Sequence, residues 1–152
     1  MSKAPHDAVV IALGARHRGD DGIGAMIAAA LRERRAPCRI VESCDDSLAL
    51  LNAWDSAALA IVVDAAVSGA APGTVHRLDD TQAPAVKDPA RCSVHGLGLA
   101  EAMQLGRVLG RLPARLVVFA VEAKSFDIGA GVSPELAAKV PAVAHEIALE
   151  LA

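Results

Sequence analysis

Residues 59–64 constrain the fold most, because Leu, Ala, Ile, Val and Val follow one another without a polar break before Asp64. A strand with one face in water alternates apolar and polar residues, whereas a continuous apolar run is typical of a parallel sheet covered on both faces. Residues 9–13 and 116–121 have the same character and predict further buried strands. The chain is therefore expected to fold around a central, mostly parallel sheet.

Segments with helical spacing separate these strands. Residues 23–31 carry apolar side chains three or four positions apart, as one helix face requires. Further helices are expected after the predicted strand 38–42, from about 93 to 109, and from Ser133, a candidate N-cap followed by Pro134. Pro141 is expected to kink or split that last helix. Strands alternating with helices predict a three-layer α/β/α fold, with residues 1–152 forming a single domain.

Composition excludes several classes of protein. The chain has 152 residues and is 53% hydrophobic, but no apolar run reaches the roughly 18 residues of a membrane span. Its net charge of −3 and aromatic content of 2% offer neither a basic surface nor a stacking platform for nucleic acid. The polar N-terminus does not resemble a signal peptide, and an odd number of cysteines suits reduced thiols. We expect a cytoplasmic protein without a membrane span.

Residues 18–24 read Arg-Gly-Asp-Asp-Gly-Ile-Gly and connect the first predicted strand to the first predicted helix. A glycine-rich turn in this position often binds phosphate. Here, however, Asp20 stands where a phosphate loop carries lysine, and Asp21 follows, so a cation is the more natural ligand. The glycine order also differs from the dinucleotide-binding fingerprint. Alternatively, either aspartate caps the helix, and one can cap while the other faces a cleft.

Three polar residues are predicted at the carboxyl edge of the sheet, where ligands of such folds bind. They are Asp21 in the turn, Asp64 after the central apolar run, and His95 at the start of a helix. Each has a structural alternative, since Asp64 could accept backbone hydrogen bonds and His95 could simply occupy a helix terminus. Together, two carboxylates and an imidazole form an incomplete ligand set for a borderline divalent metal, with coordination positions left open.

Four motifs in order resemble those of the hydrogenase maturation endopeptidases. They are residues 18–24, residues 61–65 with the Pro-Gly-Thr at 72–74, residues 93–99, and the Gly-Val-Ser-Pro at 131–134. Members of that family remove a short C-terminal extension from the large subunit of nickel-iron hydrogenases after nickel insertion. The resemblance implies a five-stranded, mainly parallel sheet with one short antiparallel strand, which agrees with the edge strand predicted at 74–78.

The resemblance also implies a site and a substrate. The metal-binding and catalytic residues of the family fall on Asp21, Asp64 and His95. The implied partner is a nickel-iron hydrogenase large-subunit precursor, which carries the nickel itself, and no organic cofactor is implied. One departure is Ala15, where the family usually has asparagine, so substrate placement at this turn is expected to differ. Water activated by the metal and a carboxylate general base both remain possible mechanisms.

Other hypotheses fit parts of the sequence. Cys92 and His95 have a spacing seen in structural zinc sites, with Cys44 as a possible further ligand. Glu122 could line the cleft or end its strand in solvent, and Arg18 could steer the substrate or form a surface salt bridge. No Gly-x-Ser-x-Gly elbow supports a serine nucleophile. The alternative functions are a hydrolase of a small amide or ester with its own metal, and a non-catalytic metallochaperone or binding partner of a hydrogenase subunit.

Overall fold

A computed structural model describes residues 7–14, 18–42, 46–79 and 96–152. It contains a five-stranded sheet in the order β2-β1-β3-β5-β4. Neighbouring strands are parallel except for β4 and β5, which are antiparallel. The predicted fold class, including the short antiparallel edge strand, is therefore confirmed. The strands are β1 (Ala8–Ala12), β2 (Arg39–Glu42), β3 (Leu59–Ala66), β4 (Val75–Asp79) and β5 (Arg115–Glu122).

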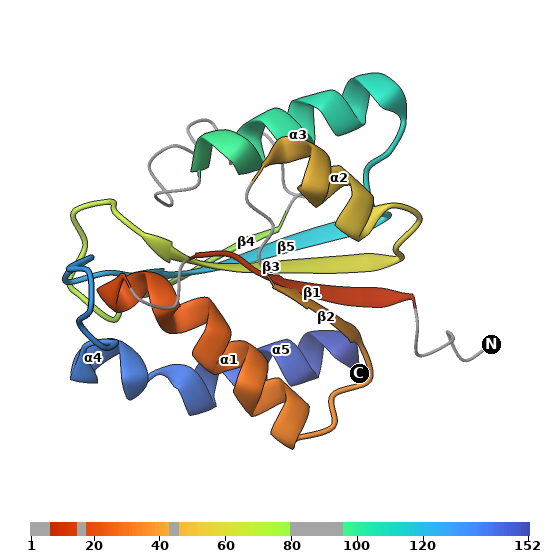
Figure 1. Ribbon diagram of the computed structural model, residues 1–152. Coiled ribbons are helices and arrows are strands. Elements are labelled where there is room, and N and C mark those ends of the chain that lie inside the picture. The colour runs from red at the N-terminus through yellow and green to blue at the C-terminus, as the bar shows by residue number, and fades with distance from the viewer. Residues whose placement is uncertain (1–6, 15–17, 43–45, 80–95) are drawn as a thin grey trace.

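Helices cover both faces of the sheet (Figure 1). One layer contains α1, α4 and α5, and the other contains α2 and α3. A short 3-10 helix, η1, leads directly into α1. The helices are η1 (Gly19–Gly22), α1 (Ile23–Glu33), α2 (Ser47–Trp54), α3 (Gly96–Leu109), α4 (Pro134–Ala137) and α5 (Val140–Leu151).

The two helical layers pack on two separate apolar cores. Alternate side chains of each strand belong to one core or the other. In β3, Ile61 and Val63 belong to the core beneath α1 and α5, whereas Ala60 and Val62 belong to the core beneath α2 and α3. Successive side chains of a strand point to opposite faces, so one strand can serve both cores. Every residue of β3 is buried, as the uninterrupted apolar run predicts.

The structure corrects two details of the predicted elements. β3 continues past Asp64 to Ala66, because the ladder with β5 extends to the pair Ala66 and Glu122. Helical spacing in residues 47–54 predicts Leu48 on the same side as Leu51 and Trp54, but Leu48 is 58% exposed whereas the other two are fully buried. The buried residues of α2 are Leu50, Leu51 and Trp54, and the Trp54 indole Nε1 donates to the backbone oxygen of Arg111 at 3.0 Å.

Pro141 splits the C-terminal segment, as expected. α4 ends at Ala137, and α5 starts at Val140 with the proline in its first turn. Proline suits that position because the first N–H groups of a helix have no partner within the helix. The break lets α4 pack near the carboxyl edge while α5 runs back along the sheet (Figure 1).

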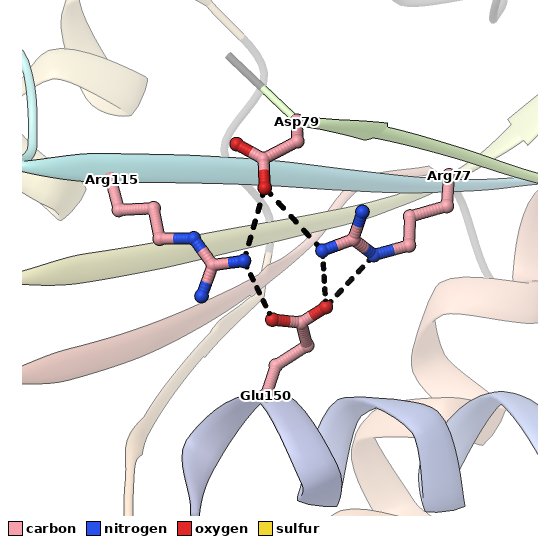
Figure 2. A network of polar contacts seen from close by, with 4 residues as sticks. All are labelled: Arg77, Asp79, Arg115 and Glu150. Carbon is pink, nitrogen blue, oxygen red and sulfur yellow. Dashed lines mark hydrogen bonds and ion pairs between the residues drawn. The ribbon is translucent and has the colours of Figure 1, made fainter. Parts of the chain in front are cut away.

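A polar network closes the opposite edge of the sheet, where β5 begins and β4 ends (Figure 2). Asp79 accepts from Arg77 Nη2 at 3.4 Å and from Arg115 Nη2 at 3.0 Å. Glu150 of α5 accepts from Arg115 Nη2 at 3.0 Å and also binds the Arg77 guanidinium. The network fastens α5 to the two edge strands at the end of the sheet remote from the predicted site. Within the described ranges, no helix is long and apolar enough to span a membrane.

Candidate functional site

Asp64 lies near the carboxyl end of β3, next to the chain that leaves β1. Ala12 is in register with Val63, and the N–H of Leu13 donates to the Val63 carbonyl at 2.9 Å. The Asp64 side chain is only 2% exposed, and its Oδ1 accepts from the N–H of Ala65 at 2.8 Å. Alternation along β3 assigns Asp64 to the same face as Val62, the face covered by α2 and α3.

Asp21 is brought to the same edge by η1. Its side chain is 1% exposed, and η1 lies against β3. Gly14, which follows β1, has a φ of 107°, and a Cβ atom there would lie 2.2 Å from the backbone oxygen of Asp21 and 2.8 Å from its Oδ1. The bare glycine backbone therefore lets the chain pass directly over this carboxylate. Asp21, carried by η1 against β3, and Asp64, near the end of β3, thus both lie toward the carboxyl edge of the sheet.

His95 lies outside the described residues, as do Cys44, Cys92 and Ala15. Its place in the chain is immediately before Gly96, where α3 begins. α3 covers the sheet face to which Asp64 belongs. Within the part of the chain that the structure describes, no three His, Cys, Asp or Glu side chains are grouped to hold a metal ion. The predicted three-residue site and the zinc alternative both stay predictions.

Asp20 differs from its neighbour because it binds the protein itself. It is fully buried, and its Oδ2 accepts from the N–H groups of Lys124 at 2.7 Å and Ser125 at 3.0 Å. Its Oδ1 accepts from the N–H of Ser133 at 2.6 Å and from the Ser133 hydroxyl at 2.7 Å. Burial alone would raise the pKa of Asp20, but these hydrogen bonds outweigh it and lower that pKa.

These contacts change the roles expected for two residues. Asp20 caps neither η1 nor α1, since neither helix has a side-chain cap. Ser133 occupies the N-cap position of α4, but its hydroxyl binds Asp20 rather than the helix. Sequence reasoning missed the pair because the two residues are 113 positions apart. One indication of this pair was present in the sequence, because Asp20 and Ser133 both belong to motifs that resemble the same family.

Glu122 closes β5 at the same edge, but it is 2% exposed, so the expectation of a solvated strand end is wrong. Its carboxylate accepts from the N–H groups of Ser68 and Ala70, each at 2.9 Å to Oε1, and from the Ser68 hydroxyl. The His76 Nε2 lies 4.0 Å from Oε1. Burial would raise the pKa of Glu122, yet the hydrogen bonds from Ser68 and Ala70 and the nearby imidazole lower it. Glu122 thereby holds the loop that follows β3.

Arg18 lies on the rim of this edge. The residue is exposed, and its backbone forms an isolated antiparallel bridge with Ile128. Ile128 itself is 83% exposed. Whether Arg18 contacts a substrate stays a prediction.

Comparison with known proteins assigns the family. A profile described as hydrogenase maturation protease matches residues 26–150, a span that includes Asp64 and His95 and begins after Asp21. The chain belongs to the hydrogenase maturation protease family. The family predicted from the four motifs is therefore confirmed.

Other hydrogenase maturation proteins resemble this chain in sequence, and their solved structures resemble it in fold. The hydrogenase 2 maturation protease of Escherichia coli is 32% identical over 84% of this chain and 80% of its own length. The HupD hydrogenase expression/formation protein of Thiocapsa roseopersicina is 27% identical over 93% of this chain, which spans 66% of HupD. The structure of the Escherichia coli hydrogenase maturating endopeptidase HybD has a TM-score of 0.82 at 27% identity, covering 95% of this chain and 91% of HybD.

A [NiFe] hydrogenase maturation protease HybD from Thermococcus kodakarensis gives a TM-score of 0.75 at 25% identity, covering 95% of this chain and 98% of that protein. The enzyme class predicted from the sequence, a maturation endopeptidase, is the class of these homologues.

Proposed function

We propose that this protein is an endopeptidase that removes the C-terminal extension of a nickel-iron hydrogenase large-subunit precursor after nickel insertion. Asp21, Asp64 and His95 bind the nickel that the precursor carries, so cleavage depends on the metal being in place. Family membership supports the reaction, and one structural observation supports the site. That observation is the burial of two carboxylates, Asp21 in η1 and Asp64 near the carboxyl end of β3, which are 1% and 2% exposed.

The donor set suits this task chemically. Carboxylate oxygens and an imidazole nitrogen are ligands for borderline divalent metals, and three ligands leave coordination positions for groups of the substrate. Binding substrate-borne nickel at this edge brings the scissile peptide next to the same carboxylates, which lowers the barrier by proximity. A water molecule then attacks the peptide carbonyl. Either the metal or one of the carboxylates, acting as a general base, activates that water.

Mass spectrometry of the precursor tests the reaction. Purified protein is incubated with nickel-loaded and nickel-free precursor, and loss of the C-terminal peptide is expected only with nickel. His95→Ala is expected to abolish cleavage without changing the unfolding midpoint. His145→Ala is the matched control, because His145 is exposed on α5 and is expected to leave cleavage unchanged.

Other results would favour other functions. Stable binding of the nickel-loaded precursor without cleavage would indicate a metallochaperone or a non-catalytic partner. A stoichiometric metal in the purified protein, together with hydrolysis of a small ester or amide, would indicate a hydrolase with its own metal. Normal cleavage by the His95→Ala variant would remove His95 from the site.

We place the reaction in the cytoplasm. Cys38 is a free thiol among the described residues, and burial raises its pKa, which keeps it protonated and poorly reactive. A reduced thiol suits a reducing compartment. Cell fractionation with an antibody to the protein tests this, and recovery outside the cytoplasmic fraction would contradict it.

A further inference from the structure

The contacts of Asp20 join three segments that are distant in the sequence. Asp20 lies in η1, Lys124 and Ser125 follow β5, and Ser133 precedes α4. Both carboxylate oxygens accept two hydrogen bonds each, and all four donor distances lie between 2.6 and 3.0 Å. Three of the four donors are backbone N–H groups, so the carboxylate fixes the path of the chain itself. Such charge-assisted hydrogen bonds are stronger than neutral ones.

The same contacts fix the turn that carries Asp21. The N–H of Asp20 donates to the Ser125 carbonyl at 2.8 Å, and the N–H of Gly19 donates to the Ala130 carbonyl at 3.2 Å. Gly19 has a φ of 55°, and a Cβ atom there would lie 2.7 Å from the Ser125 carbonyl oxygen. η1 is therefore held from both backbone and side chain against the segment 124–133. Asp21 is the next residue along, so its position depends on these bonds.

We propose that Asp20 is the positioning residue of the proposed active site: it fastens η1 to the Gly-Val-Ser-Pro motif at 131–134 and so sets where the Asp21 carboxylate lies relative to Asp64. This inference rests on the proposed function. The motif at 131–134 contains none of the proposed metal ligands, and the positioning of η1 gives it a structural role in the site. Ser133 receives Asp20, and Pro134 starts α4 immediately afterwards.

Asp20→Asn is the decisive variant, because it keeps the shape of the side chain but replaces one acceptor oxygen with an NH₂ donor. Whichever way the amide turns, that NH₂ group faces backbone N–H donors. We expect the maximal rate of precursor cleavage to fall about 10- to 100-fold, since a small misplacement of a reacting group has effects of this size. KM is expected to change little, because a fully buried Asp20 cannot contact the precursor directly.

Asp79→Asn is the matched control. Asp79 is also a buried carboxylate, 7% exposed, but it binds Arg77 and Arg115 at the opposite edge of the sheet. We expect this variant to lose stability yet keep a cleavage rate within about twofold of wild type at a temperature where both variants are folded, because Asp79 lies at the end of the sheet remote from the proposed site. Ser133→Ala provides a milder test at the site, since it removes the hydroxyl donor and keeps the three backbone donors. Its cleavage rate is expected to lie below that of wild type and above that of folded Asp20→Asn. If Asp20→Asn fails to fold, Ser133→Ala tests the positioning role by itself.

The outcomes separate the two proposals. No cleavage by the wild-type protein would overturn the proposed function itself. Active wild type with unimpaired Asp20→Asn, or with unimpaired Ser133→Ala if Asp20→Asn fails to fold, would overturn the positioning role alone. Equal losses in folded Asp20→Asn and Asp79→Asn would reduce Asp20 to an ordinary stabilising residue.

Discussion

Asp20 and Asp21 are chemically identical neighbours with different surroundings. Asp20 is enclosed by four donors from the segment 124–133, whereas Asp21 lies under the bare backbone of Gly14 at the edge of β1 and β3. The sequence did not reveal the anchoring role of Asp20, because that role arises from chain segments that are far away. The structure assigns the anchoring contacts to Asp20, whereas Asp21 is the carboxylate that the proposed site uses.

Gly14→Ala is expected to disturb Asp21 directly. The added Cβ would lie 2.2 Å from the Asp21 backbone oxygen, and the φ of 107° is unfavourable for alanine. We expect a loss of about 1–3 kcal/mol in unfolding free energy, from backbone strain alone, and a large loss of precursor cleavage. Chemical denaturation and the cleavage assay measure the two effects.

Gly110→Ala is the control for the backbone strain of an alanine at positive φ, without a steric clash. Gly110 has a φ of 67°, but an added Cβ would meet nothing within 4 Å. This variant is expected to lose about 1 kcal/mol of stability, the usual cost of a left-handed alanine, and to cleave the precursor normally. If Gly14→Ala cleaved as well as Gly110→Ala, close packing over Asp21 would have no part in activity.

Glu122 is expected to make stability depend on acid pH. Its pKa in the folded protein lies below the ordinary value of 4.5, so its contribution is complete above about pH 4.5 and is lost as pH falls through the lowered pKa. Glu122→Gln should cost about 1–3 kcal/mol near neutral pH, because buried acceptors lose their charge-assisted hydrogen bonds. The difference between wild type and variant should shrink as pH falls.

Urea unfolding at a series of pH values measures that difference. Glu146→Gln, at an exposed position on α5, removes the same charge without touching the loop after β3. A constant difference between wild type and Glu122→Gln across the acid range would show that the hydrogen bonds from Ser68 and Ala70 do not depend on the charge.

At the scale of elements, the sequence predicted what local pattern determines. The apolar run of β3, the helical spacing of α1 and the break at Pro141 are all local signals, and each is confirmed. The exposure of Leu48 was not predicted, because spacing within a helix does not determine how closely each turn approaches the sheet. The capping role of Ser133 was wrong because a distant carboxylate competes for its hydroxyl. Asp21, in η1, and Asp64, near the end of β3, both lie toward the carboxyl edge of the sheet, and their joint site with His95 stays a prediction.

Glu150→Gln tests how strongly α5 is fastened to the edge strands. Glu150 binds both Arg77 and Arg115, which also share Asp79 (Figure 2). The arginines are 37% and 39% exposed, so solvent screens the network. We expect a loss of no more than about 1 kcal/mol, declining as salt is added. Urea unfolding at low and high salt measures it, and a loss independent of salt would indicate packing rather than charge.

At the scale of the whole molecule, the sheet separates two apolar cores of the described residues, one on each of its faces. Leu51 and Trp54 pack on one face, and Ile27 packs on the other. β3 supplies alternate residues to both cores and is paired on both sides, with β1 and with β5. Removing either helical layer would therefore expose the apolar side chains of the same strand to water. The folding of residues 1–152 as one domain stays a prediction.

Leu51→Ala and Ile27→Ala test that coupling from opposite faces. Both side chains are fully buried, so each truncation is expected to cost about 2–5 kcal/mol. Trp54 is the single tryptophan and lies in the α2 face, so its fluorescence reports unfolding of that core. If the sheet couples the cores, fluorescence and far-ultraviolet circular dichroism will give one shared midpoint in both variants. Val108→Ala, at a position 81% exposed, should leave the midpoint almost unchanged. A fluorescence midpoint that stays at the wild-type value in Ile27→Ala while circular dichroism shifts would mean that the two layers unfold separately.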